Sequence, residues 1–211
     1  MATDDVDDAV LLGAWTRGDP GAGAELFRRY YAAVLRFYRS KVGPQAPDLV
    51  QRCFLRCLEV RSRIRDESGF RCFLFGVARN VLFEHYRSTR AGARIDFTEQ
   101  TVEDLGPTPT SELDRGERSQ QLLLALRRIP VEQQIVIELY YWEDLNAREI
   151  AEIFEIPEPT VRTRLRRAKL RLEQELQGLG SSPAAALDTT TNLDAWARRL
   201  SDRLDQQAEE R

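Results

Sequence analysis

The sequence has almost no lysine and almost no histidine, and both shortages limit the functional sites that it could form. Only Lys41 and Lys169 are lysines, so 29 of the 31 basic residues are arginine. The planar guanidinium suits bidentate contacts with phosphates and base edges, although a GC-rich genome would produce the same bias. With His85 as the single histidine there is no H-E-x-x-H motif, and neither G-x-S-x-G nor G-x-x-x-x-G-K-[ST] occurs. We therefore expect no enzymatic activity and no cofactor.

Long apolar runs are also absent. The 211 residues are 42% hydrophobic and 31% charged, which is typical of a folded chain, and no run of 18 apolar residues exists. The first residues, MATDDVDDAV, are acidic where a secretory signal would be basic and then apolar. Three cysteines make an odd number, which favours a reducing compartment over a disulfide framework. We expect a cytoplasmic protein with no membrane insertion.

The cysteines raise the question of a metal site. Cys53, Cys57, Cys72 and His85 together would make a Cys₃His zinc set. However, each lies on the apolar stripe of a predicted helix, and the short C-x₂-C spacing of a zinc knuckle is missing. Core packing is the better interpretation, and we expect no metal.

Charge is distributed unevenly along the chain. The net charge is −3, yet residues 61–94 hold eight arginines against three acids. Residues 96–117 hold seven acids against one arginine, and residues 157–172 hold six basic residues against one acid. Two basic blocks with an acidic connector between them predict two polyanion-binding surfaces on one chain.

Apolar spacing predicts an all-α fold. Helices are expected over about 6–17, 24–42, 47–61 and 69–91, with short turns between them. Four such helices make one compact bundle, which we assign to residues 1–92.

The remainder of the chain divides into three parts. Residues 93–116 lack a clear period and form a flexible acidic linker. Residues 117–178 form a second helical domain. The extension 179–211 begins with a flexible joint, since GLGSSPAAALDTTT spans 178–191. Leu193, Trp196, Ala197, Leu200 and Leu204 then predict an amphipathic helix.

The second domain carries a helix-turn-helix pattern. Asn146 and Glu149 are spaced as a capping box that starts a short helix, AREIAEIF. EIP forms the turn, and Pro159 falls in the first turn of the next helix, where its missing N–H does little harm. The second helix of this motif enters the major groove by its N-terminal end. The side chains predicted to meet duplex DNA are Thr160, Arg162, Thr163, Arg164, Arg166 and Arg167. The alternative is a solvated charged face.

The fourth helix of the first domain alternates cations and aromatic rings opposite its apolar stripe. Arg71, Phe75, Arg79, Phe83 and Arg87 are spaced by four, with Asn80 and Tyr86 beside them. Aromatic platforms among cations suit unstacked single-stranded bases. The alternative is that Phe75 and Phe83 pack against another helix.

These segments together resemble the extracytoplasmic-function (group 4) sigma factors of the sigma-70 family. DLVQRCFLRCLE (48–59) resembles region 2.2, and FRCFLFGVARNVLFEHYRSTR (70–90) resembles regions 2.3 and 2.4. Residues 122–172 resemble region 4 with its helix-turn-helix. With the helix at 24–42, the resemblance covers about two-thirds of the chain.

The resemblance implies a role for each surface. The chain would bind core RNA polymerase at the β′ clamp and the β flap and direct initiation at promoter DNA, with an anti-sigma factor as a further partner. The clamp would meet Asp48, Leu49, Gln51, Phe54 and Leu55. The melted −10 element would meet Arg71, Arg79, Asn80, Phe83, Tyr86, Arg87 and the 61–69 loop. The duplex −35 element would meet the six residues predicted on the helix-turn-helix, and the acidic linker would pass through the polymerase.

The sequence departs from the family pattern in three places. Phe73 stands where the family often has Trp, and Pro159 stands where it often has Gly. The 179–211 extension has no counterpart in the minimal pattern, and we expect its helix to fold back or to meet a regulator. Two other functional classes stay open on the sequence. One is a stand-alone helix-turn-helix regulator; the other is a helical adaptor that acts only through protein contacts.

Overall fold

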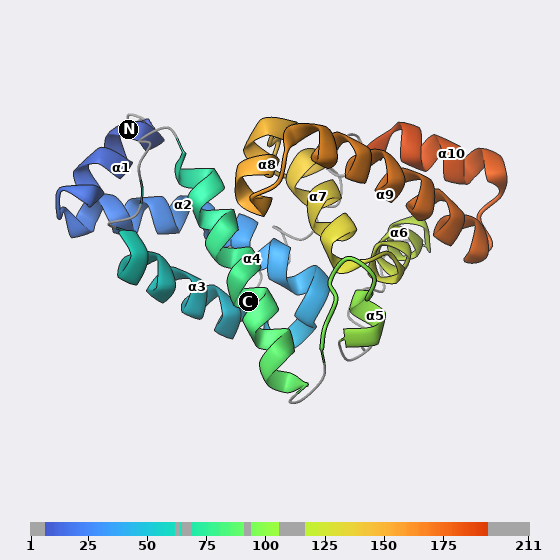
Figure 1. The fold of residues 1–211 in the computed structure, drawn as a ribbon, viewed down its shortest axis with the longest axis horizontal. Coiled ribbons are helices and arrows are strands. Elements are labelled where there is room, and N and C mark those ends of the chain that lie inside the picture. The colour runs from blue at the N-terminus through green and yellow to red at the C-terminus, as the bar shows by residue number, and fades with distance from the viewer. Residues whose placement is uncertain (1–6, 62–63, 65–68, 91–93, 106–116, 194–211) are drawn as a thin grey trace.

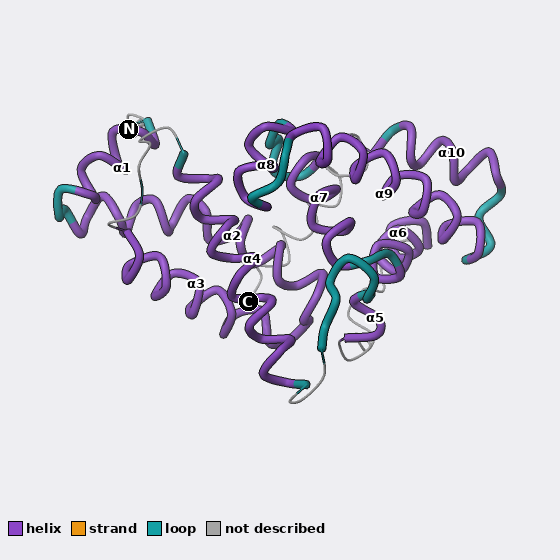
Figure 2. Tube along the Cα trace, viewed as in Figure 1, coloured by secondary structure: helices purple, strands orange, loops and turns teal. Residues whose placement is uncertain are grey.

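The protein is described from a computed structural model, which covers residues 7–61, 64, 69–90, 94–105 and 117–193. Within these ranges the regular elements are helical, as the apolar spacing predicted (Figures 1 and 2). None of the described helices is both long enough and apolar enough to cross a bilayer. In chain order the helices are α1 (Asp8–Thr16), α2 (Pro20–Val42), the 3₁₀ turn η1 (Gly43–Gln45), α3 (Ala46–Val60), α4 (Phe70–Thr89), α5 (Val102–Leu105), α6 (Glu117–Arg128), α7 (Val131–Tyr141), α8 (Ala147–Phe154), α9 (Glu158–Gly178) and α10 (Pro183–Thr191).

Helices α1 to α4 form the first block. The carboxylate of Asp19 caps α2 by accepting a hydrogen bond from the Gly21 N–H at 2.8 Å. Helices α1 and α2 pack closely because Gly23 faces the indole of Trp15, and a Cβ there would lie 2.4 Å from that ring. The core of the block is aromatic, and burying each such side chain stabilises the fold by about 1.5–3 kcal/mol. Its largest fully buried members include Trp15, Tyr38, Phe70 and Phe75.

Helices α6 to α10 form the second block. Residues of α6, α7 and α9 share a hydrophobic cluster. Helix α10 packs on α9, and Leu193 just beyond α10 is buried in the same cluster. The members with the least exposure are Leu122, Ala125, Leu126, Ile129, Ile137, Ala168, Leu172 and Leu176.

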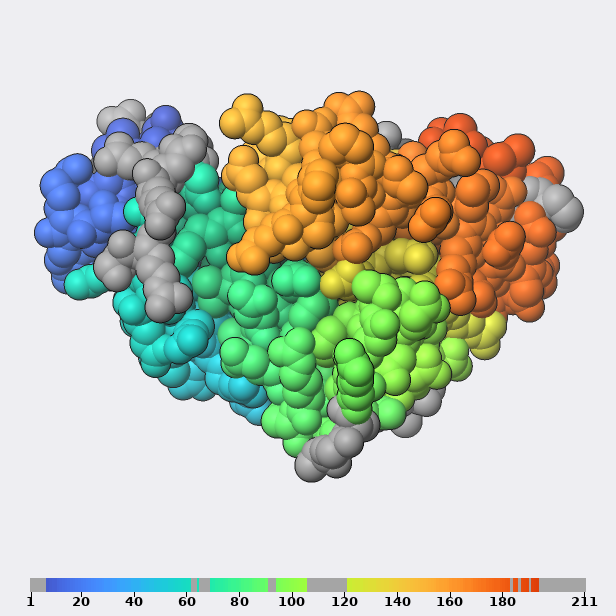
Figure 3. Space-filling model, viewed as in Figure 1, coloured from blue at the N-terminus to red at the C-terminus, as the bar shows by residue number. Residues whose placement is uncertain are grey.

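The two blocks lie directly against each other. Val131, Ile135 and Leu139 from α7, together with Ile150 from α8, belong to the same buried cluster as the aromatic core of the first block. In Figure 3 the surface of α8 and α9 (orange) adjoins that of α4 (green), and α4 contacts α8. One hydrophobic core therefore runs through both blocks in this structure.

The described part of the linker is packed against both blocks. Phe97, Val102 and Leu105 are buried. The backbone N–H of Val131 donates to the Gln100 carbonyl at 2.9 Å, and that of Glu132 donates to the Phe97 carbonyl at 3.1 Å. The sequence predicted no regular structure here, but residues 102–105 form the short helix α5.

The prediction of a flexible joint over 178–191 was wrong, because α10 occupies most of it. The hydroxyl of Ser182 caps α10 by accepting from the Ala185 N–H at 3.2 Å, and Pro183 falls in the first turn. The following alanines are strong helix formers. Except for the buried Leu193, the predicted amphipathic helix of the tail lies outside the described residues.

Candidate nucleic-acid interfaces

The helix-turn-helix forms as predicted, and its capping box is complete. The Asn146 N–H donates to Glu149 Oε2 at 2.7 Å, and Asn146 Oδ1 accepts from the Arg148 and Glu149 N–H groups at 3.0 and 3.1 Å. Helix α8 is followed by its C-cap Glu155, which has a left-handed backbone with φ 55°. The chain turns through Ile156 into α9, whose N-cap is Pro157.

Helix α9 presents a basic face to solvent. The predicted inner stripe is inward, with Val161, Ala168 and Leu172 buried and Leu165 half-buried. Arg162 pairs with Glu158 at 2.6 Å, and its side chain is 72% exposed. The structure exposes five of the six predicted residues, namely Thr160, Arg162, Thr163, Arg166 and Arg167.

Arg164 differs from the other five because its side chain is half-buried against α7 and α8. Its guanidinium pairs with the carboxylate of Glu132 at the start of α7 and lies 5.4 Å from the ring centre of Phe154. Glu132 also pairs with Arg79 of α4 at 3.2 Å. One carboxylate thus binds a cation from each of the two predicted DNA-binding helices.

The second predicted surface, on α4, is only partly open. Asn80 and Arg87 are exposed, while Arg71 and Arg79 are half-buried. Tyr86 was predicted beside the solvent face, but it is buried and its hydroxyl donates to the Lys41 carbonyl at 3.2 Å. Tyr86 is buried because α2 packs over that side of α4.

The packing alternative predicted that Phe75 and Phe83 contact another helix; both rings are buried, but the ring stacked on Phe83 belongs to the linker. Phe75 lies in the core with its ring centre 5.8 Å from that of Phe37. Phe83 is stacked on Phe97 of the linker, with ring centres 3.8 Å apart and 7° between the planes. The 61–69 loop, predicted to contact the same promoter element, lies largely outside the described residues.

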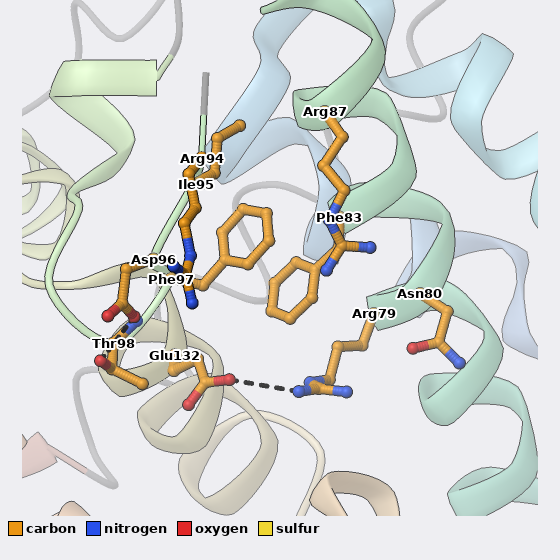
Figure 4. A pocket seen from close by; sticks show the side chains of 10 residues that line it. All are labelled: Arg79, Asn80, Phe83, Arg87, Arg94, Ile95, Asp96, Phe97, Thr98 and Glu132. Atoms are coloured by element: carbon orange, nitrogen blue, oxygen red, sulfur yellow. Dashed lines mark hydrogen bonds and ion pairs between the residues drawn. The ribbon is translucent and has the colours of Figure 1, made fainter. Parts of the chain in front are cut away.

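A hollow of about 350 Å³ lies between α4, the linker and α7 (Figure 4). Phe83 and Phe97 face each other in it, and the Arg79 guanidinium lies 4.5 Å from the Phe83 ring centre. Arg87 lies 5.5 Å from the ring centre of Phe97. Burial lowers the pKa of Arg79, and Glu132 opposes that shift. The hollow combines cations with aromatic rings, which is the chemistry that binds unpaired bases.

The predicted polymerase-binding residues on α3 are divided between surface and core. Asp48, Gln51 and Leu55 are exposed, Phe54 is half-buried, and Leu49 is buried in the core. Phe54 stacks on Phe27 of α2, with ring centres 4.5 Å apart and 13° between the planes.

Phe54 also lines a second hollow, of about 400 Å³, with residues of α2. Sequence reasoning missed Phe27 and Tyr31, whose spacing of four on α2 was the available signal. Tyr31 of α2 and Leu55 and Leu58 of α3 leave 45%, 52% and 44% of their surface exposed.

The cysteines lie where core packing predicted. Cys53 and Cys57 are buried, and Cys72 is half-buried. A hydrogen bond with Cys53, together with burial, raises the pKa of the Cys57 thiol. Among the residues that the structure describes, no three metal-ligating side chains gather.

Both blocks match known protein families. Residues 26–92 match the family Sigma-70 region 2, and residues 119–172 match Sigma-70, region 4. The chain is 34% identical over 175 residues to the ECF RNA polymerase sigma factor SigL of Mycobacterium tuberculosis, covering 77% of this chain and 96% of SigL. It is 30% identical over 162 residues to the RNA polymerase sigma factor YlaC of Bacillus subtilis, covering 72% of this chain and 90% of YlaC.

Two solved structures share the fold. CnrH, in complex with the cytosolic domain of CnrY, matches with a TM-score of 0.59 at 19% identity, covering 81% of this chain and 97% of that chain. The sigma factor RpoE of Bartonella quintana, in complex with the anti-sigma factor NepR, matches with a TM-score of 0.54 at 20% identity, covering 72% and 97%.

A helix-turn-helix block joined to a second helical block that matches region 2 defines a sigma factor, a transcription initiation factor without enzymatic activity. The chain belongs to the sigma-70 family, in its extracytoplasmic-function class. The region 2 match does not favour a stand-alone helix-turn-helix regulator, which would need region 4 alone.

Proposed function

We propose that this sigma factor uses three separate surfaces to start transcription. The α2–α3 side would bind core RNA polymerase at the β′ clamp through Asp48, Gln51, Phe54 and Leu55, and region 4 would meet the β flap. The exposed face of α9 would bind the duplex −35 element. The Arg-rich and aromatic face of α4 would hold unpaired bases of the −10 element.

The observation that carries the proposal is the presence of two basic faces of different construction on one chain. Helix α9 exposes arginines and threonines from a capped helix-turn-helix, which suits the major groove of a duplex. Helix α4 places guanidinium groups over aromatic rings, which suits unstacked bases. A protein that needed only duplex DNA would have no use for the second face.

The division of labour along the chain follows the same proposal. Residues 1–92 would serve the polymerase and the −10 element, 93–116 would connect, and 117–178 would serve the −35 element. Residues 179–211 would fold back or meet a regulator. CnrH and RpoE are solved with CnrY and with the anti-sigma factor NepR, so we include an anti-sigma factor among the proposed partners. As a partner of RNA polymerase, the protein would act in the cytoplasm.

The test is binding to purified bacterial core RNA polymerase, followed by transcription in vitro from genomic fragments. We expect promoter-selective transcripts that require this protein, and their start sites would reveal both elements. Leu55→Asp should weaken core binding, while Val10→Asp, at an apolar side chain of α1 that is 59% exposed and outside the proposed surface, is the matched control. Absence of core binding by the wild-type chain would contradict the proposal.

A further inference from the structure

Three of the groups proposed to bind DNA, Arg79, Arg164 and Phe83, are already engaged within the chain. Glu132 pairs with Arg79 from the −10 face and with Arg164 from the −35 face. The rings of Phe83 and Phe97 are parallel and 3.8 Å apart, which is a full stacking contact. In this arrangement neither Arg164 nor Phe83 is available to a nucleic acid.

The Glu132 carboxylate and the Phe97 ring each make the kind of contact that DNA would make with the same partner. A carboxylate, like a phosphate, presents two oxygens that a guanidinium group binds through charge-assisted hydrogen bonds. A phenyl ring stacked on Phe83 makes the contact that an unpaired base would make. The Arg79 guanidinium lies between Phe83 and Phe154, 4.5 and 4.6 Å from their ring centres, so it links the covered face of α4 to α8.

We infer that the free chain holds itself in a closed form in which Glu132 takes the place of a backbone phosphate and Phe97 takes the place of an unstacked base. The inference rests on the proposed function, because it assigns the covered groups to the promoter. DNA binding by Arg79, Arg164 or Phe83 then requires the contacts of Glu132 and Phe97 to break.

The junction between the two blocks buries ionic groups as well as apolar ones. Apolar residues of α7 and α8 share the cluster of the first block, and the buried pairs Arg36–Glu143 and Lys41–Glu138 lie at the same junction. Interfaces that part and meet again are more polar than permanent cores, because their groups must also be stable in water. Each buried polar or charged residue of the described chain bonds across this junction or to a residue that does: Arg36, Lys41, Arg127, Glu132, Gln134, Glu138 and Glu143.

The experiment measures the affinity of the free full-length chain for two labelled probes, an oligothymidylate and a mixed-sequence duplex, at one fixed salt concentration. Glu132→Gln keeps the shape of the side chain and removes the pairing charge. Phe97→Leu keeps an apolar side chain and removes the stack. Glu103→Gln is the matched control, because Glu103 is a linker carboxylate that pairs with Arg128 at 3.3 Å, away from both faces.

If the closed form dominates, a variant's affinity for a probe rises in proportion to the fraction of molecules in the open form. We expect Glu132→Gln to bind both probes about tenfold more tightly, which corresponds to weakening the closed form by about 1.4 kcal/mol. Phe97→Leu should raise the affinity for the oligothymidylate more than the affinity for the duplex. The control should change either affinity by less than about twofold. Equal affinities for control and variants would overturn the inference.

A second measurement uses the wild-type chain and does not depend on how the variants fold. The Val131 and Glu132 amides donate to linker carbonyls in the closed form. Their hydrogen exchange should accelerate when oligothymidylate is added, and unchanged protection in the DNA-bound chain would overturn the inference. Transcription with core polymerase is scored separately. If the wild-type chain gives no promoter-selective transcript, the proposed function fails, and the free-chain affinities still decide the closed form.

Discussion

Lys41 of α2 and Glu138 of α7 form an ion pair in the protein interior, where their side chains are 0% and 1% exposed. The ammonium group also donates to the Phe37 carbonyl at 2.7 Å, and the second carboxylate oxygen accepts from Ser40 at 2.9 Å and from Gln134 at 2.7 Å. Burial lowers the pKa of Lys41, and the carboxylate of Glu138 opposes that shift. This network joins the block that matches region 2 to the block that matches region 4.

Removing one partner of this pair should be costly, since it leaves the other charge buried and unpaired. We expect Glu138→Leu to lower the free energy of unfolding by about 3–5 kcal/mol in urea denaturation. The double variant Lys41→Met with Glu138→Leu should recover most of that loss, because it leaves neither charge behind. If the double variant lost as much free energy of unfolding as the two single variants together, the two charges would not be coupled.

Arg162 is the exposed α9 cation best placed to test base recognition. Arg162→Ala in the polymerase complex should cost about 1–3 kcal/mol of promoter binding and relax preference at one −35 position. The measurement compares affinities over a panel of single-base promoter variants. A loss that is uniform over the panel would make Arg162 a phosphate contact. Glu158→Gln, which frees Arg162 from an exposed pair, should not weaken binding.

The capping box of α8 should contribute measurably to the stability of the helix-turn-helix. Asn146→Ala removes the acceptor for two backbone N–H groups and should lower the free energy of unfolding by about 0.5–2 kcal/mol. Asn146→Asp keeps an acceptor at the same place and serves as the control. Equal unfolding midpoints for the two variants would mean that the cap is not stabilising.

His85 should titrate below the ordinary histidine pKa of 6.5, because burial and the nearby charge of Arg52 disfavour the imidazolium. Its neutral form is favoured in the folded state, so this contribution to stability is present above pH 6.5 and is lost as the pH falls through the lowered pKa. An NMR titration of the only imidazole in the chain measures this directly, and His85→Gln should flatten the dependence. A midpoint at or above 6.5 would contradict the assignment.

Local sequence signals predicted the helices and the helix-turn-helix well, since amphipathic spacing and capping chemistry act within a few residues. The spacing of Val161, Leu165, Ala168 and Leu172 is enough to orient α9. The C-terminal joint was predicted wrongly because glycine and serine at 178–182 masked the helix-forming PAAAL that follows.

The covering of the α4 face could not be predicted in the same way. The contact of Phe83 with Phe97 depends on the path of a linker that has no periodicity. Glu132 has the sequence context of an ordinary first-turn acid, and nothing local shows that it meets Arg79, 53 positions away. Tertiary contacts of this kind are set by how the blocks dock.

Footprinting of the polymerase–promoter complex tests the two-face assignment most directly, using variants of two exposed residues, Asn80 on α4 and Arg166 on α9. Nuclease protection reports the −35 duplex, and permanganate reactivity of thymines reports melting at the −10 element. We predict that Arg166→Ala weakens upstream protection, whereas Asn80→Ala keeps that protection and reduces melting. If both variants changed the same element, or if neither changed its own, the two faces would not have the roles proposed for them.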